Sequence, residues 1–398
     1  MSETMNPAIG GILTGRKLEW FHHKSLAEWG YTEEQTDTFA VLHPSEDCKA
    51  ESYPLYVVFH SAGHDVYSTV ACTWQKGNHD IYHAPTDMFA LYLDCRQHAN
   101  DWWWGGNSAH DVIGEGREGT EKQPVENRVV ATIEWVMEHY PIDRNRVYAV
   151  GNSMGGSGAL GIAMCRGDLF AAVKANVPAG VCHMTARCGL DSDAPEAPEG
   201  FRLPDPPVLV DYSAQNDGWS KGHEILYRRM REKKYAVLGY WGMFGHENNN
   251  DRIRAVNDLV HSFDLFRIRL NEAYPVFTNA DCDDPLPWSD DGSIIHENAG
   301  QINSFFRWDK AVETETDVKI PLRLLTRDEW ESRVDFPVRA KADVTLRRLQ
   351  ICRFEAGADV TWECGSQSGV VCVDENGLVT VPGVEIGTDP VTLILRKA

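Results

Sequence analysis

Positive charge is scarce in this chain of 398 residues. It carries 38 lysines and arginines against 59 aspartates and glutamates, which gives a formal net charge of −21 at pH 7. Nucleic acids and anionic membranes would be repelled by such a surface, so we expect neither as a partner. A strongly anionic substrate is disfavoured for the same reason.

Long apolar runs are also lacking. No stretch of the sequence approaches the roughly 18 apolar residues that a membrane-spanning helix needs. The first residues, MSETMNPAIGG, have neither the basic nor the apolar region of a secretory signal. We therefore expect a cytoplasmic protein, or a secreted one whose signal has been removed. The sequence leaves the oligomeric state open.

Metal-binding patterns are missing as well. The ten cysteines are scattered without a C-x-x-C pair, and most are expected to be reduced and structural. His79, Asp80 and His83 lie close together in the sequence, but no helical or strand pattern would hold them as ligands. We therefore predict no metal and no organic cofactor.

A serine between two glycines directly follows a predicted strand. The run Val147–Val150 is β-branched and aromatic, and Gly151-Asn152-Ser153-Met154-Gly155 comes next without a spacer. Glycines at these positions permit a sharp strand-to-helix turn that exposes the serine. We predict that Ser153 is a nucleophile. An incidental serine in a glycine-rich turn is the alternative.

An earlier strand leads into a loop that suits the same chemistry. The apolar run Leu55–Phe59 is followed by His60-Ser61-Ala62-Gly63. Such a loop supplies one backbone N–H to an oxyanion hole, and the residue after the nucleophile, Met154, supplies the other. We take Ser61 as the first candidate for the upstream donor and Ala62 as the second. A plain strand-to-loop exit is the alternative.

An aspartate and a histidine follow late strands of the chain. Asp217 lies in the loop after the strand that begins at Val208, and His246 follows the strand Tyr235–Tyr240 at a glycine-marked turn. The order Ser, Asp, His is the one expected of the α/β-hydrolase topology. Asp211 is the rival acid, but its place in or at the end of the strand is badly suited to reach His246.

Strands and helical patterns alternate over the first part of the chain. Apolar residues between Glu126 and His139 share one helical face, and further strand runs occur at Met88–Leu93 and Phe170–Val177. This alternation predicts a mostly parallel sheet flanked by helices. We expect a catalytic domain of the α/β-hydrolase fold over residues 1–275.

Several aromatic and polar residues follow the predicted strands at the edge where ligands bind in parallel sheets. Three consecutive tryptophans cannot all enter one core, so we expect at least one to face the substrate, with purely structural packing as the alternative. For His183, which is also a candidate substrate contact, the alternative is a solvent-exposed position in a loop. The candidate substrate contacts are Trp102, Trp103, Trp104, His183 and Trp219.

The pattern changes after about Tyr274. Helical periodicity gives way to short alternating runs, namely Asp343–Leu346, Val370–Val373, Leu378–Val381 and Val391–Leu395. The turn sequence Asp374-Glu375-Asn376-Gly377 predicts a hairpin between two of these runs. We expect an all-β, sandwich-like accessory domain over residues 276–398. It would bind carbohydrate or simply pack against the catalytic domain.

Four segments carry a resemblance to a known group of enzymes. FHSAGHD, IDRNRVYAVGNSMGGSGALG, QNDGWSKGH and FGHE resemble the esterase and depolymerase branch of the α/β-hydrolases, which includes acetyl xylan and feruloyl esterases of carbohydrate esterase family 1. The resemblance covers about residues 30–265. Those relatives often have a glycine-rich H-G-x-G loop, from which His60-Ser61-Ala62-Gly63 departs.

The resemblance implies a serine carboxylesterase that removes acetyl or feruloyl groups from plant-type polysaccharide. Ser153, His246 and Asp217 would be its triad, and a small-molecule or oligosaccharide ester its substrate. A peptidase or a thioesterase for small metabolites would use the same triad. A non-catalytic carbohydrate-binding protein on a hydrolase fold is the third possibility.

Overall fold

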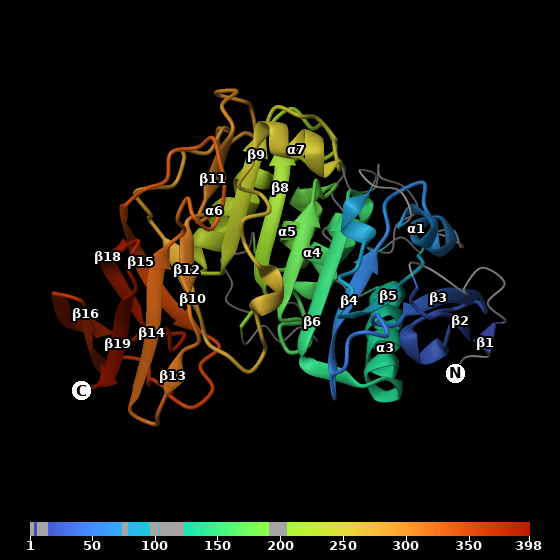
Figure 1. Cartoon of the computed structure of the whole chain (residues 1–398), viewed down its shortest axis with the longest axis horizontal. Helices are drawn as coiled ribbons and strands as arrows, with labels where there is room; N and C mark the ends of the chain where they lie inside the picture. The colour runs from blue at the N-terminus through green and yellow to red at the C-terminus, as the bar shows by residue number, and fades with distance from the viewer. Residues whose placement is uncertain (1–3, 6–14, 74–78, 96–102, 104–122, 191–204) are drawn as a thin grey trace.

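The computed structural model describes residues 4–5, 15–73, 79–95, 103, 123–190 and 205–398. A ten-stranded sheet in the order β1-β2-β3-β5-β4-β6-β7-β8-β9-β11 forms its centre (Figure 1). The strands are β1 (Thr4–Met5), β2 (Leu18–Lys24), β3 (Thr36–Leu42), β4 (Tyr53–Phe59), β5 (Phe89–Tyr92), β6 (Ile142–Asn152), β7 (Ala172–Asn176), β8 (Val208–Ala214), β9 (Val237–Gly242) and β11 (Gly300–Ile302).

The middle of this sheet is parallel. β5, β4, β6, β7, β8 and β9 pair in parallel, whereas β1, β2, β3 and β11 extend the two sides with antiparallel pairs. The strands read as continuous apolar runs because both faces are covered. In β6, Val147 and Ala149 enter one core cluster, while Tyr148 and Val150 enter the other.

Helices cover both faces of the sheet. One face packs against α3 (Pro124–His139), α4 (Met154–Ala163), α5 (Val181–Arg187) and α6 (His223–Glu232). The other packs against α1 (Val66–Cys72), α7 (Asn250–Val256) and the 3-10 turn η3 (Leu265–Arg267). Two further 3-10 turns are η1 (Ala27–Trp29) and η2 (Asp80–Tyr82). This arrangement confirms the predicted α/β-hydrolase fold.

None of the helices in the described ranges combines the length and the apolar character that crossing a bilayer would require.

The C-terminal part is built from antiparallel strands, as predicted. β10 (Tyr274–Thr278), β15 (Arg339–Arg347) and β18 (Thr380–Gly387) form a three-stranded sheet. A six-stranded sheet has the path β12-β14-β19-β16-β17, with β13 paired to β14. Its strands are β12 (Phe306–Trp308), β13 (Val312–Glu313), β14 (Asp317–Leu324), β16 (Asp359–Cys364), β17 (Gln367–Cys372) and β19 (Val391–Lys397).

The predicted hairpin around Asp374–Gly377 is wrong in its pairing. The turn itself forms, since Gly377 N–H donates to Asp374 O and Asp374 N–H donates to Leu378 O. However, β17 and β18 belong to different sheets, so the turn connects two layers. β17 pairs with β16 instead. The turn residues determine a chain reversal, whereas strand pairing depends on which sheet buries each strand.

The two parts of the chain interlock. β10 spans the expected boundary between residues 275 and 276, and β11, which lies beyond it, returns to pair with β9 of the central sheet. The buried Asn303 side chain donates to Val237 O in β9 and to Phe277 O in β10. The division into residues 1–275 and 276–398 therefore stays a prediction about folding units.

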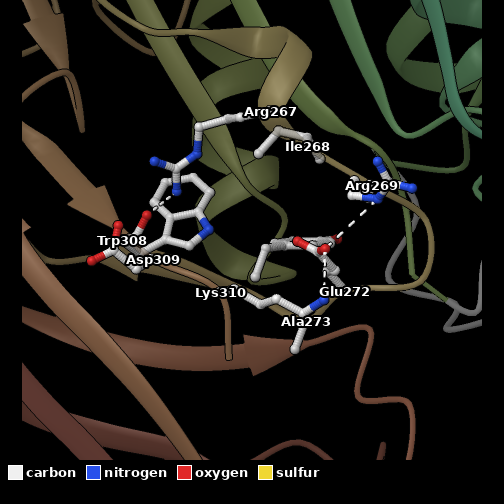
Figure 2. Close-up of a pocket in the computed structure, with 9 residues that line it drawn as sticks. Arg267, Ile268, Arg269, Glu272, Ala273, Trp308, Asp309 and Lys310 are labelled. Atoms are coloured by element: carbon white, nitrogen blue, oxygen red, sulfur yellow. Dashed lines mark hydrogen bonds and ion pairs between the residues drawn. The ribbon is translucent and has the colours of Figure 1, made fainter. Parts of the chain in front are cut away.

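A cavity of about 210 Å³ lies at this junction, where η3 and the segment after it meet β12 (Figure 2). Its charged side chains pair with one another across the walls. Glu272 Oε1 lies 3.2 Å from Lys310 Nζ and 3.7 Å from Arg269 Nε. The Arg267 guanidinium lies 4.7 Å from the ring centroid of Trp308. These contacts tie the catalytic part to the C-terminal sheets.

Candidate active site

Ser153 stands on a strained turn between β6 and α4. Its φ of 53° and ψ of −120° are unusual for a side chain other than glycine, at a cost of about 1–3 kcal/mol. The flanking glycines explain how the turn fits. A Cβ on Gly151 would lie 2.2 Å from Gly155 O, and one on Gly155 would lie 2.0 Å from Phe59 O. The turn therefore requires glycine at both positions.

Three loops at one edge of the sheet bring Ser153, His246 and Asp217 together. The loops follow β6, β9 and β8, whose carboxyl ends meet at this edge because the strands are parallel. His246 Nε2 lies 2.7 Å from Ser153 Oγ, and His246 Nδ1 lies 2.6 Å from Asp217 Oδ2. The imidazole is thus hydrogen-bonded to a hydroxyl on one side and a carboxylate on the other.

Asp217 is held as an anion by its surroundings. Burial alone would raise the pKa of this carboxyl, but the hydrogen bond and charge of His246 outweigh burial and lower the pKa below its usual value. Two further donors contribute: Trp219 N–H donates to Oδ1 at 2.9 Å, and the Ser220 hydroxyl lies 2.9 Å from Oδ2. A carboxylate with these donors orients the imidazole and stabilises its cation.

The His246 loop is anchored at both ends. Before it, Gly245 N–H donates to Asn216 Oδ1 at 2.9 Å, which ties this loop to the one that carries Asp217. After it, Glu247 accepts from the backbone N–H of Asn248 and Asn249 and pairs with Arg252 at 2.7 Å. These contacts fix the loop, in which the His246 side chain is 30% exposed.

The proposed oxyanion donors differ in availability. Met154 is the first residue of α4, and its N–H lies at the positive end of the helix dipole. Ser61 N–H donates to the Tyr82 hydroxyl at 2.7 Å, and that hydroxyl donates to Ser61 Oγ at 2.9 Å. Within the described residues, Ala62 N–H has no hydrogen-bond acceptor. Of the two candidates, Ala62 is therefore the one whose N–H is not already engaged.

The tryptophan prediction needs a correction at Trp103. Its ring is 1% exposed, packs against Gly158 of α4 and donates from Nε1 to His60 O at 3.0 Å. It fills space behind α4 and is too buried to contact a ligand at the sheet edge. Trp102 and Trp104 lie outside the described residues.

The other candidate contacts fall into two groups. Trp219, two residues after Asp217, is 43% exposed and is available to a ligand at this edge. His183 lies in α5, and its side chain is outside the described part of the chain. A cavity of about 530 Å³ lies next to Asp217, and its lining also includes Gly218, Trp288 and Ile294.

The rival acid Asp211 has a different partner. Its Oδ2 lies 3.0 Å from His223 Nε2 and accepts a hydrogen bond of 2.5 Å from the Tyr227 hydroxyl. Both side chains of the ion pair are at most 1% exposed. Asp211 therefore belongs to a buried cluster under α6, and Asp217 is the carboxylate that meets His246.

The sequence reasoning missed two residues that shape this site. Ser220 braces Asp217, and its position three residues later in the same loop was the available signal. Tyr82 holds the Ser61 amide from a turn 21 residues away, for which the sequence offers no spacing rule.

The comparison with protein families finds one match. The Esterase family, described as "Putative esterase", matches residues 99–258, a segment that contains Ser153, Asp217 and His246. This match confirms the predicted resemblance to esterases with the α/β-hydrolase fold. No sequence among the curated proteins matches the chain.

Several solved structures align with part of the chain at low sequence identity. An S-formylglutathione hydrolase from Agrobacterium tumefaciens aligns with 17% identity over 61% of this chain and 93% of its own, with a TM-score of 0.43. An acetyl xylan esterase from Paenibacillus sp. R4 aligns with 11% identity over 66% of this chain and 88% of its own, with a TM-score of 0.40. A ferulic acid esterase aligns with 13% identity over 63% of this chain and 98% of its own, with a TM-score of 0.41.

Proposed function

Starting from a serine esterase with the α/β-hydrolase fold, we propose that the chain removes acetyl or feruloyl groups from plant-type polysaccharide with Ser153, His246 and Asp217 as its triad. One observation carries the catalytic half of this proposal. The hydroxyl, imidazole and carboxylate form a continuous hydrogen-bonded chain with contacts of 2.7 and 2.6 Å. Such a chain is the arrangement that activates a serine for acyl transfer.

Acylation follows from the positions of the protons. His246 Nε2 takes the proton of Ser153 as Oγ attacks the ester carbonyl, and Asp217 stabilises the resulting imidazolium. The histidine then gives this proton to the departing alcohol. Water attacks the acyl-serine in the second step, again with His246 as the base, and releases the acid.

Backbone donors would stabilise the negative charge of both tetrahedral intermediates. Met154 N–H and Ala62 N–H are the candidates, and each such donor contributes roughly 3 kcal/mol. Ser61 N–H could take part only after its hydrogen bond to Tyr82 is broken. Its substrate contact would therefore cost the free energy of that bond.

The substrate half of the proposal rests on the sequence resemblance and on aromatic groups near the triad. Trp219 is exposed beside Asp217, and Trp288 lines the adjoining cavity. Aromatic rings stack on sugars and phenolic groups. The net charge of −21 also fits a neutral ester better than a strongly anionic substrate.

The first experiment compares wild type and Ser153→Ala on p-nitrophenyl acetate and p-nitrophenyl ferulate. We expect kcat to fall by about 10⁶-fold in the variant, because the nucleophile is lost. Ser366→Ala, in the exposed turn after β16, is the matched control and should keep full activity. Equal rates for Ser153→Ala and wild type would refute the nucleophile.

The second experiment addresses the substrate class. The protein should release acetate or ferulate from esterified xylan, and failure to release either would remove the polysaccharide claim. Faster turnover of a small thioester would instead favour the thioesterase alternative, and cleavage of an amide would favour a peptidase. If a fluorophosphonate failed to label Ser153, the non-catalytic carbohydrate-binding alternative would gain support.

A further inference from the structure

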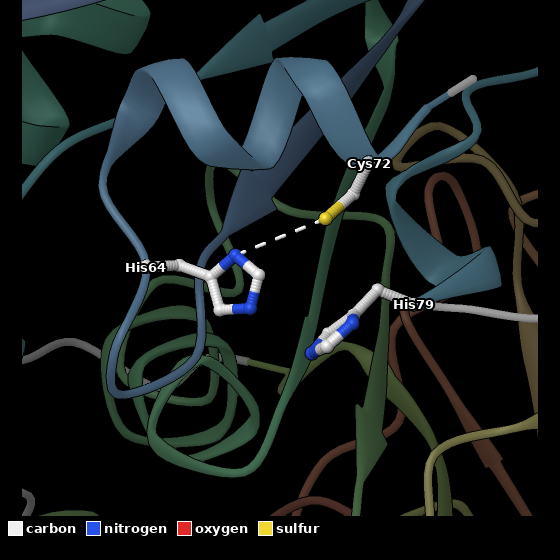
Figure 3. A group of neighbouring side chains, drawn as sticks. All are labelled: His64, Cys72 and His79. Carbon is white, nitrogen blue, oxygen red and sulfur yellow. Dashed lines mark hydrogen bonds between the residues drawn. The ribbon is translucent and has the colours of Figure 1, made fainter. Parts of the chain in front are cut away.

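A cluster of two imidazoles and a thiol lies next to the candidate active site. His64 precedes α1, Cys72 ends α1, and His79 precedes η2, yet their side chains turn toward one common space (Figure 3). One nitrogen or sulfur atom from each lies within 4.8 Å of the others. His64 Nδ1 is 3.9 Å from Cys72 Sγ, and the two imidazole centroids are 4.5 Å apart.

We propose that His64, Cys72 and His79 bind one Zn²⁺ ion, with a fourth coordination position left to water or a small ligand. Two imidazole nitrogens and a thiolate form a ligand set typical of zinc. The set contains no carboxylate or carbonyl oxygen, which are the ligands that Mg²⁺ and Ca²⁺ prefer. Closing the atoms from 4.8 Å to tetrahedral spacing needs a shift of about 1 Å.

Local backbone structure positions the three side chains of the cluster. Asp65 caps α1 by accepting from Ser68 N–H at 2.7 Å, and the Ser68 hydroxyl accepts from Asp65 N–H at 2.9 Å. This reciprocal cap fixes the start of the helix beside His64 and thereby positions Cys72 at its end. His79 has a φ of 51°, a left-handed conformation that directs its side chain toward the other two.

The electrostatic environment favours a cation in this space. Asp80, the neighbour of His79 in the chain, and Glu247 in the His246 loop place negative charge within range of His79. On binding, zinc would form a bond to Cys72 Sγ while the thiol proton leaves to solvent.

The cluster contacts both loops that serve the candidate active site. His64 lies two residues after Ala62, and its N–H donates to Ser61 O at 3.2 Å. His79 Nε2 lies 3.2 Å from Nδ2 of Asn248 in the His246 loop. Tyr82, which binds the Ser61 amide, stacks on His79 at 5.0 Å. A bound ion would therefore join these two loops from behind.

Cobalt is a suitable probe, because Co²⁺ takes zinc sites and absorbs light when bound to a thiolate. The full-length protein, stripped with a chelator, is titrated with Co²⁺ and then with Zn²⁺. We expect one equivalent of Co²⁺ to give a thiolate-to-cobalt absorption band that Zn²⁺ abolishes. Mg²⁺ and Ca²⁺ at the same concentrations should leave the band unchanged.

Variants assign the signal to this cluster. Cys72→Ser should remove the thiolate band, and His64→Asn should weaken Co²⁺ binding by more than about 100-fold while keeping the thiol. Cys372→Ser removes an exposed thiol of β17 and should retain the band. Unchanged melting temperatures of the metal-free variants show that each is folded. A band that survives in Cys72→Ser, or no binding by wild type, overturns the proposal.

Ser153→Ala separates this proposal from the proposed function. The variant should bind Co²⁺ like wild type, because Ser153 contributes no ligand. Loss of esterase activity therefore says nothing against the zinc site, and failure of metal binding says nothing against the triad.

Discussion

Two histidine–aspartate pairs in this protein use opposite ring nitrogens to face the carboxylate. One is His246–Asp217 at the sheet edge, and the other is His223–Asp211 under α6. In the edge pair, Nδ1 of the imidazole meets the carboxylate and Nε2 meets the Ser153 hydroxyl. In the buried pair, Nε2 meets the carboxylate and Nδ1 lies 2.9 Å from Ser220 O. A third pair, His60–Asp94, is also fully buried, but its Nε2 lies 3.2 Å from Asp94 Oδ1 and also accepts a hydrogen bond from Cys95 N–H at 3.3 Å.

The difference shows which contact makes such a pair useful for catalysis. A backbone carbonyl can only accept a hydrogen bond, so Nδ1 of His223 must carry a proton, while Nε2 lies beside the Asp211 carboxylate. That carboxylate favours the charged form of His223. Burial alone would lower its pKa, but the charge of Asp211 raises the pKa above the usual value. An imidazole that faces a hydroxyl can instead accept a proton from it.

Within this comparison, the largest expected effect comes from Asp217→Asn. The amide cannot stabilise the imidazolium and favours the wrong tautomer of His246, so we expect kcat per folded molecule to fall by about 10⁴-fold. Steady-state kinetics on p-nitrophenyl acetate measure this effect. If Asp211→Asn lowered kcat per folded molecule as strongly as Asp217→Asn, the assignment of the acid would be wrong.

Asp211→Asn should act mainly on stability. It leaves a buried histidine without its counter-charge, and breaking such a pair costs about 3–5 kcal/mol. Urea denaturation should show a lower free energy of unfolding, while the folded fraction keeps its kcat. A variant as stable as wild type would show that this pair is a dispensable feature of the core.

Ser220→Ala probes the bridge between the two pairs. The Ser220 hydroxyl contacts Asp217, whereas its carbonyl contacts His223. Losing one hydrogen bond to the Asp217 carboxylate costs about 1.5 kcal/mol, which corresponds to roughly a tenfold lower kcat. Ser220 also lines the cavity beside Asp217, so comparing kcat with KM separates a role at Asp217 from a substrate contact, and we expect the change in kcat. A change in KM alone would contradict this role.

The pH dependence of stability gives the smallest effect. A histidine with a raised folded-state pKa stabilises fully below the unfolded pKa of about 6.5, and this contribution is lost as pH rises through the folded value. The stability difference between wild type and His223→Gln should therefore shrink above pH 6.5, by at most about 1.4 kcal/mol per pH unit. Denaturation at pH 6, 7, 8 and 9 tests this sign, and a widening difference would refute it.

Features that depend on short stretches of sequence were predictable. The glycines around Ser153 could be interpreted from the motif alone, because a sharp strand-to-helix turn demands them. The clash that Gly151 avoids lies within this turn, at Gly155 O, whereas the clash that Gly155 avoids is with Phe59 O of the distant strand β4. The order of strands and helices likewise predicted a parallel sheet and the edge where Ser153, Asp217 and His246 meet. Strand ends of a parallel sheet converge whatever the loop sequences are.

Features that depend on contacts between distant segments were not predictable. The exclusion of Trp103 from the site follows from the space that Gly158 leaves for its ring. The return of β11 to β9 and the separation of β17 from β18 depend on which sheet buries each strand. The hydrogen bond that occupies the Ser61 N–H depends on the distant Tyr82. The cluster of His64, Cys72 and His79 follows no sequence motif.

The sequence by itself therefore determined the fold class, the glycine-flanked serine turn and the set of acidic and basic side chains available at the sheet edge. The sequence also favoured Asp217 over Asp211 as the partner of His246. Tertiary structure alone decided that Asp211 pairs with His223, and which ring nitrogen of each histidine faces its carboxylate. The physical reason is that backbone turns and periodicities are local, whereas hydrogen-bond partners of a buried side chain are selected by packing between segments that are far apart in the chain.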